Sequence, residues 1–239
     1  MRIAAGFHFS ARARVIMLAA AVFAAAMLCP RTAAAAAVGD VYVYRVVNGY
    51  NHEVRGHIAY RVDYVGADRF FLSVTPDTPL LGPARTEVYA LNGNWLLHTV
   101  INHDQPIEYE FVQEYPAYVF PLDRGKSWSL RVGAIDPVSN QRVSVRVDAE
   151  VLGTERIVTP AGAFDTIKVR RRVYAGDAEA FRQETTIDET EWYAPVLGRP
   201  VRSESNSGYM NPSRCGRGAC RPVRGDWNLF ELIQTSVAR

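Results

Sequence analysis

The chain has 239 residues, of which 22% are charged and 48% hydrophobic, with 17 glycines and 13 prolines. This composition is that of a folded globular chain of one or two domains, and it excludes disorder, collagen and a coiled coil. The formal net charge is +2, but the first 37 residues hold four arginines and no acidic residue. The remainder is close to neutral, so charge gives no reason to expect nucleic acid binding.

The N-terminus has the three parts of a secretory signal peptide. Basic residues come first, an unbroken apolar run spans 15–28, and the small residues 33–37 follow. The apolar run is shorter than the ~20 residues that cross a bilayer. We therefore expect a signal peptide over residues 1–37, cleaved near Ala37, and a periplasmic or secreted protein. No other stretch approaches that length, so no transmembrane span is expected after cleavage.

Cysteines add two expectations. Lipid attachment at Cys29 is an alternative fate for the leader, but Leu28 stands where a lipobox has a small residue, so we favour cleavage without an anchor. Two cysteines then remain, Cys215 and Cys220. An even number of cysteines in an exported protein predicts a disulfide. Their C-x4-C spacing, without a nearby histidine, argues against a metal or redox site.

Apolar and polar residues alternate almost throughout the rest of the chain, which is the period of half-buried strands. The predicted strands lie at 41–47, 69–75, 87–91, 95–100, 143–151, 164–174, 184–194 and 227–237. Asn92-Gly93-Asn94 predicts a hairpin between two of them. No long window has the helical period. The prediction is one all-β domain over 38–239, a strongly bent antiparallel sheet or partly open β-barrel of about 10–12 strands with little helix.

The longest stretch without a strand pattern is 203–226. A loop of that length is expected to be functional or held in place. The predicted disulfide between Cys215 and Cys220 would hold it.

Catalytic and metal-binding motifs are scarce. Neither Gly-x-Ser-x-Gly nor His-Glu-x-x-His occurs in the sequence. The histidines outside the leader are His52, His57, His98 and His103. Both pairs are spaced by five, which on a strand directs the side chains to opposite faces. We expect surface or loop histidines, no metal site, no cofactor and no enzymatic activity.

Carboxylates at Asp188, Glu189 and Glu191 leave glycoside hydrolysis open in principle. The arginines at 170–172 lie on the preceding predicted strand and could face these acids across the ladder. We favour this structural pairing over catalysis. Phosphate binding by the arginines is a further alternative, but alternation directs Arg171 away from its two neighbours.

Aromatic residues crowd the middle of the chain. They are Tyr109, Phe111, Tyr115, Tyr118, Phe120 and Trp128. One interpretation is an aromatic rim that binds an apolar or carbohydrate ligand. The other, which we favour, is packing in the core. These six residues are the candidate binding residues of the chain.

Two blocks of sequence resemble a known family. Residues 151–172 read VLGTERIVTPAGAFDTIKVRRR, and residues 191–198 read EWYAPVLG. They are similar to a G-x-E-x-x-x-T-P-A-G-x-F hairpin and a W-Y-A-P-x-x-G turn in the domain-of-unknown-function 3108-like group of exported bacterial β-proteins. The opening residues 39–44 are also similar to that group's beginning. The resemblance implies an envelope protein with a bent antiparallel sheet, distantly like the half-barrels of lipoprotein carriers, and it implies no catalytic residue.

Three functions follow as alternatives. The favoured one is a non-enzymatic envelope protein that binds an apolar or amphipathic, lipid-like ligand in its curved sheet. The second is an assembly module that recognises an envelope protein through an exposed strand edge. The third is an envelope hydrolase acting on a glycan or an ester.

Overall fold

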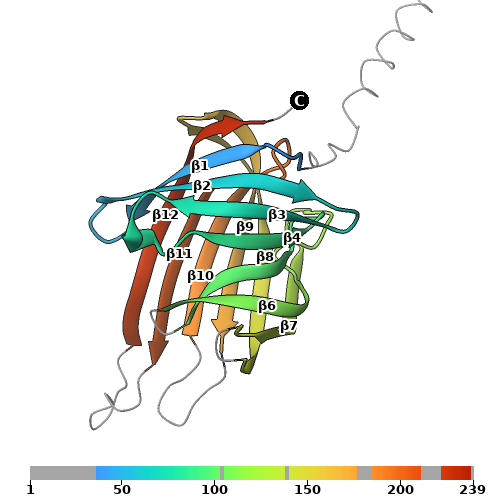
Figure 1. The fold of residues 1–239 in the computed structure, drawn as a ribbon, viewed down its shortest axis with the longest axis vertical. Coiled ribbons are helices and arrows are strands. Elements are labelled where there is room, and N and C mark those ends of the chain that lie inside the picture. The colour runs from blue at the N-terminus through green and yellow to red at the C-terminus, as the bar shows by residue number, and fades with distance from the viewer. Residues whose placement is uncertain (1–35, 103–104, 138–139, 177–184, 211–221, 238–239) are drawn as a thin grey trace, which may run out of the picture. The chain divides into compact units, whose positions relative to one another are not determined.

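The computed structural model describes residues 36–102, 105–137, 140–176, 185–210 and 222–237. Twelve antiparallel strands form a closed barrel in which each strand pairs with its neighbours in sequence and β1 pairs with β12 (Figure 1). The strands are β1 (Val41–Asn48), β2 (Val54–Val65), β3 (Arg69–Pro76), β4 (Arg85–Ala90), β5 (Trp95–Asn102), β6 (Gln105–Tyr115), β7 (Ser127–Ile135), β8 (Arg142–Thr159), β9 (Gly162–Ala175), β10 (Thr185–Ala194), β11 (Arg199–Met210) and β12 (Pro222–Ser236). A 3₁₀ turn at Pro79–Leu81 precedes β4.

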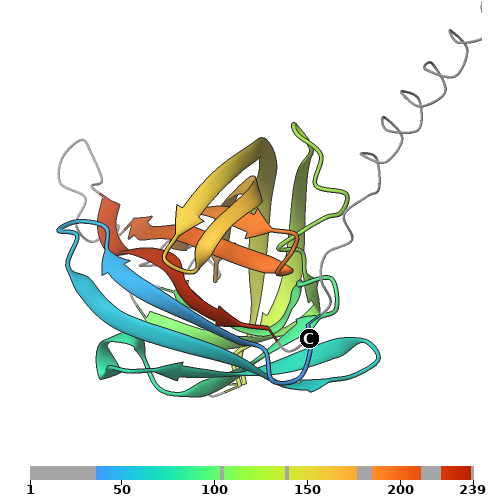
Figure 2. The same ribbon diagram turned by 90° about the horizontal axis from the view of Figure 1, so that it is seen from above.

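The barrel is made of two curved layers. In Figure 1, β1–β4 run across the front and β8–β12 run steeply behind them. Figure 2 shows the same two groups from above, on opposite sides of the interior. Side chains alternate between the two faces of each strand, so every second residue of both layers points inward and must be buried there.

The predicted fold class is confirmed, and so is the number of strands. The three turns that the sequence marks with glycine have the backbone that glycine allows: φ is 84° at Gly93, between β4 and β5, 137° at Gly162, after the β8–β9 turn, and 66° at Gly198, between β10 and β11. A side chain disfavours these angles, whereas glycine adopts them freely. The Asn92-Gly93-Asn94 hairpin is therefore present.

The predicted loop over 203–226 is wrong in its extent. Residues 203–210 belong to β11 and residues 222–226 to β12. Ser203 pairs with Phe230 and Asn206 with Trp227, so serine, asparagine and glycine lie here in a strand held by ladders on both sides. The ladder, and not the local preference of these residues, determines their conformation.

Other predictions fall outside the described residues. Cys215 and Cys220 lie in the segment 211–221, so their disulfide stays a prediction. The expected signal peptide, which includes Cys29, also lies outside the described residues, except for residues 36 and 37. Among the described residues, no helix has the length and hydropathy of a membrane-spanning segment.

Apolar inward-facing residues form two main clusters. The larger one joins strands β5–β10 and includes Val145, Val147 and Val169, none of which is exposed. The second packs β1–β3 against the β10–β11 hairpin and includes Tyr44, Leu72 and Val201. A hydrogen bond from the Tyr44 hydroxyl to the carbonyl of Pro200, at 2.7 Å, ties the two layers together.

Gly49 supplies a test of this packing. A Cβ atom at this position would lie 2.2–2.5 Å from three ring atoms of Trp227. Because the indole cannot yield as a flexible side chain can, we expect Gly49→Ala to lower the free energy of unfolding by about 1–3 kcal/mol in urea denaturation. Gly133→Ala is the control, since its Cβ would meet only Val112, at 3.5 Å. Equal stability of the two variants would contradict the packing described.

Candidate functional site

The interior of the barrel holds charged side chains. On β10 the inward positions include Ile187, Glu189, Glu191 and Tyr193, and on β9 Arg171 lies across from Glu189. Alternation brings the glutamates inside together with their apolar neighbours. The predicted pairing of arginines with acids across this ladder is confirmed, both inside the barrel and outside it.

Arg171 is the centre of the first charged group. Its side chain is 1% exposed, its Nε lies 3.0 Å from Oε2 of Glu189, and its Nη2 lies 2.6 Å from Oε1 of Glu191. The third nitrogen, Nη1, donates to the carbonyl of Ala117 at 3.1 Å. The Tyr118 hydroxyl donates to the other oxygen of Glu191. A buried charge is stable only when it is paired and hydrogen-bonded in this way.

The two glutamates differ in acidity. Burial, together with the charge of Glu191, raises the pKa of Glu189 above its usual value despite Arg171. Burial also raises the pKa of Glu191, but Arg171 and the Tyr118 hydroxyl outweigh it, so that this pKa is lowered. Two causes separate them: Glu191 accepts from the Tyr118 hydroxyl as well as from Arg171, and Glu189 lies beside the charge of Glu191.

Glu87 forms a second charged group on β4. Its side chain is fully buried, and its carboxylate lies 2.9 Å from Nη2 of Arg85 and 3.1 Å from Nδ1 of His98. The Tyr89 hydroxyl donates to it at 2.6 Å. Burial alone raises the pKa of Glu87, but His98, Arg85 and Tyr89 together hold this pKa at about 2.

A stack of rings joins the two charged groups. Trp95 lies between His98, at 3.9 Å between ring centroids, and Tyr115, at 4.3 Å. The guanidinium of Arg171 lies 5.6 Å from the Trp95 ring. We refer to Glu87, His98, Trp95, Arg171, Glu189 and Glu191 as the interior network. His98 therefore lies inside the barrel, whereas the expectation was a surface or loop residue.

The other histidines differ from one another. His57 is exposed, and its Nδ1 lies 2.8 Å from a carboxylate oxygen of Asp77. His52 lies in an exposed turn, and His103 falls outside the described residues. Within the part of the chain that the structure describes, no three histidine, cysteine or acidic side chains are grouped so that they could hold a metal ion.

The six aromatic candidate residues separate into three environments. Tyr109, Phe111, Tyr115 and Tyr118 are 0–5% exposed and belong to the larger core cluster. Trp128 is half-buried and donates from its indole nitrogen to the carbonyl of Pro116. Phe120 is 43% exposed. Four of the six thus fill the core, the arrangement that the core-packing interpretation describes, and ligand binding by them stays a prediction.

Arg199, at the start of β11, occupies a different setting. Its guanidinium carbon lies 4.4 Å from the ring centroid of Tyr42, 5.5 Å from that of Tyr44 and 4.8 Å from that of Tyr60. Its Nε donates to the Tyr44 hydroxyl at 3.1 Å. These three tyrosines come from β1 and β2, in the opposite layer, and we call them the tyrosine cage.

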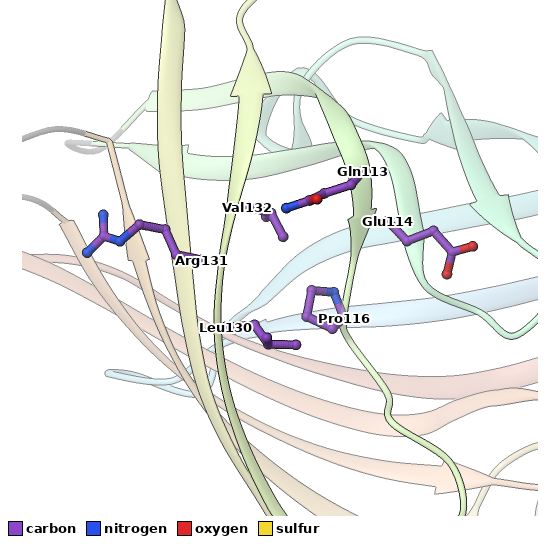
Figure 3. A pocket seen from close by; sticks show the side chains of 6 residues that line it. All are labelled: Gln113, Glu114, Pro116, Leu130, Arg131 and Val132. Carbon is purple, nitrogen blue, oxygen red and sulfur yellow. The ribbon is translucent and has the colours of Figure 1, made fainter.

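The barrel wall is paired over only a short stretch between β6 and β7. Among the described residues, the two strands pair only at Glu110–Ile135 and Phe111–Ala134, although β7 pairs with β8 along its whole length. A cavity of about 310 Å³ lies where they diverge. Figure 3 shows Leu130 and Val132 of β7 facing the Gln113 and Pro116 side of the gap.

Leu130 shows the consequence of this divergence. It lies on the same face of β7 as Val132, and its cross-strand partner on β8 is Val147, which is fully buried. Leu130 therefore has an inward position, yet it is 47% exposed, because β6 does not cover it. We call the edge of β7 from Ser127 to Gly133, with this cavity, the open edge.

Loss of Arg171 tests the interior network. We expect Arg171→Met to lower the free energy of unfolding by about 3–5 kcal/mol at neutral pH, because two buried carboxylates lose their cation. Burial then raises both carboxyl pKa values in the folded state, so the variant regains stability relative to the parent as pH falls.

The control for that variant is Arg172→Met. Arg172 pairs with Asp188 on the outer face, and both side chains are more than half exposed, so its loss changes stability by about 0–1 kcal/mol. Urea denaturation at several pH values measures both variants. Similar losses in the two, or a loss for Arg171→Met that does not change with pH, would count against the paired buried charges.

Glu87 gives a prediction of acid sensitivity. Its pKa is about 2 in the folded protein against 4.5 for the free group, so the stability it contributes is present above about pH 4.5 and is lost as pH falls toward about pH 2. We expect Glu87→Gln to lose about 3 kcal/mol at neutral pH and to show a flatter stability profile below about pH 5. Glu53→Gln, in an exposed turn, should keep the parent's profile.

Comparison with curated protein sequences finds no match. Among solved structures, the fold is similar to that of a candidate lipoprotein from Parabacteroides distasonis, with a TM-score of 0.51 and 17% identity over 84% of this chain and 96% of that one. For a candidate exported protein with a YmcC-like fold from Bacteroides fragilis, the TM-score is 0.49 and the identity 17%, over 86% of this chain and 99% of that one. For the hypothetical lipoprotein YmcC from Escherichia coli, the TM-score is 0.44 and the identity 11%, over 98% of this chain and 100% of that one.

The family comparison agrees with the sequence motifs. The model described as DUF3108-like matches residues 132–209, a segment that runs from β7 to β11 and contains both blocks quoted above. It includes Arg171, Glu189, Glu191 and Arg199, but not the β6 side of the cavity. The resemblance predicted from the sequence is therefore confirmed over residues 132–209, where this chain matches the DUF3108-like family.

Proposed function

We propose that this chain is a non-enzymatic envelope protein that recognises an extended segment of a partner protein at the open edge of β7. The observation that carries the proposal is the single-sided pairing of β7. Its residues Ser127–Gly133 are paired with β8, whereas pairing with β6 stops at Phe111 in the part of the chain described. A strand edge of this kind offers backbone donors and acceptors at the spacing of another strand.

The chemistry of the open edge favours a polypeptide as the occupant. An added strand would supply the missing backbone hydrogen bonds, which an acyl chain cannot do. Leu130 and the cavity of about 310 Å³ beside it offer space for an apolar side chain of that strand. Val112, 69% exposed on the outer face of β6, offers a second apolar side chain on the other face of the sheet.

Photocrosslinking in cells tests the proposal. A photoreactive amino acid in place of Leu130 is expected to give a discrete crosslinked polypeptide. The same amino acid in place of Val158, which is 70% exposed at the far end of β8, is the matched control and should give none. The Leu130→Lys variant loses the apolar contact between residue 130 and the bound segment. When the photoreactive amino acid stands in place of Val112, this variant should therefore give no crosslink. Crosslinks equal at 130 and 158, or none at 130, would refute recognition at this edge.

A second candidate function is binding of an amphipathic, lipid-like ligand. The aromatic residues expected to bind it largely fill the core, so its support comes from Arg199 and the tyrosine cage instead. The resemblance to exported proteins supports an envelope location for both candidates. Catalysis has less support, because Glu189 and Glu191 are both engaged by Arg171 and lie apart from the cavity at β7.

A further inference from the structure

We propose that Arg199 and the tyrosine cage form a binding site for an anionic oxygen group, a carboxylate or a phosphate. The inference deepens the second candidate function and does not depend on the open edge. The site lies at the end of the barrel where β10 turns into β11, and it is made of side chains from both layers.

The first support is the absence of an internal counter-ion. Within the described residues, no carboxylate oxygen lies within 4.0 Å of the Arg199 nitrogens, and no hydrogen bond from its terminal nitrogens is found. The interior glutamates are each engaged elsewhere, Glu87 by Arg85 and His98, and Glu189 and Glu191 by Arg171. Arg199 is thus an interior cation without a direct anionic partner.

The second support is the way the guanidinium is held. The tyrosine cage surrounds it, and Nε is already committed to the Tyr44 hydroxyl. The two terminal nitrogens remain as donors on one edge, which is the fork that binds a carboxylate or a phosphate in bidentate fashion. The cage restricts the side chain before any ligand arrives, so little conformational entropy is lost on binding.

The third support is access combined with partial burial. Arg199 is half-buried, and its terminal nitrogens are not among the buried side-chain atoms that lack a partner, so they still reach solvent. Burial lowers the pKa of Arg199, but the tyrosines around it more than compensate and keep the pKa above its ordinary value. The group is a permanent cation, and an ion pair with it is stronger here than at the exposed surface.

The surroundings also indicate what the anion is attached to. Leu197, half-buried in the turn just before Arg199, packs on the cluster that contains Tyr42 and Tyr44. An apolar group next to the anion would contact this cluster. The site is therefore suited to an amphiphile whose anionic head binds Arg199, and a free inorganic anion shares the same head-group chemistry.

Titrations of the purified, delipidated protein test the proposal. The probes are dodecanoate, dodecyl phosphate, dodecanol and inorganic phosphate, with affinities measured by displacement of a fluorescent fatty acid and by thermal shift. We expect either anionic amphiphile to bind at least about tenfold more tightly than dodecanol. We expect Arg199→Gln to weaken the binding of both anionic amphiphiles by a similar factor and to leave the affinity for dodecanol unchanged.

Arg202→Gln is the matched control. Arg202 lies on the same strand but pairs with Glu231 at 3.0 Å, so its loss should leave every affinity unchanged. Binding of inorganic phosphate that depends on Arg199 and matches the amphiphiles would support the site and identify a free anion as its ligand. Weak binding of phosphate beside tight binding of the amphiphiles would support it with an amphiphile as the ligand.

Several results would overturn the proposal. They are equal affinities for dodecanol and dodecanoate, equal losses in Arg199→Gln and Arg202→Gln, and no binding of any probe. If Arg199→Gln does not fold, the comparison of head groups on the parent protein still decides the question. None of these results bears on the crosslink at residue 130, so failure here is distinguishable from failure of partner recognition.

Discussion

The two-residue period of side chains in a closed barrel is the constraint on which this structure depends. Every second residue points inward, whatever its chemistry, and an inward residue cannot reach water by a small shift of its strand. Most of the buried apolar residues are valine, tyrosine or alanine. Glu87 is paired with Arg85 of its own strand at 2.9 Å, and Arg171 with Glu189 of the neighbouring strand at 3.0 Å. Arg199 differs from them, because tyrosine rings and not a carboxylate surround it.

The same constraint explains how far the sequence could be interpreted. Alternation, glycine turns and the absence of a helical period were sufficient to predict an all-β chain, the positions of eight of its twelve strands and their antiparallel order, but not β2, β6, β7 and β11. They also indicated that Arg171 faces away from Arg170 and Arg172. They did not indicate which face is inside, although Glu189 and Glu191 share their parity with Ile187 and Tyr193. Their position on the same face of the strand as these apolar residues was the feature of the sequence that could have predicted the interior network.

Other features had no local signal. Arg199 meets Tyr42, Tyr44 and Tyr60 only because the opposite layer of the barrel folds over the β10–β11 hairpin, and these partners are more than 130 residues away in the sequence. The extension of β11 and β12 through residues 203–226 depends on their ladder and not on strand-forming residues. Contacts of this kind are set by tertiary structure, which overrides local preference.

The short ladder between β6 and β7 bears on how the ring opens. The ladders between β4 and β5 and between β6 and β7 each have two residue pairs among the described residues, whereas β8 and β9 are joined along almost their whole length. Local opening between β6 and β7 would convert the closed ring into a curled sheet with β6 and β7 at its free margins, while the charged groups on β9 and β10 stay intact. Such an opening would expose the interior to the surroundings while the other ten strands stay paired.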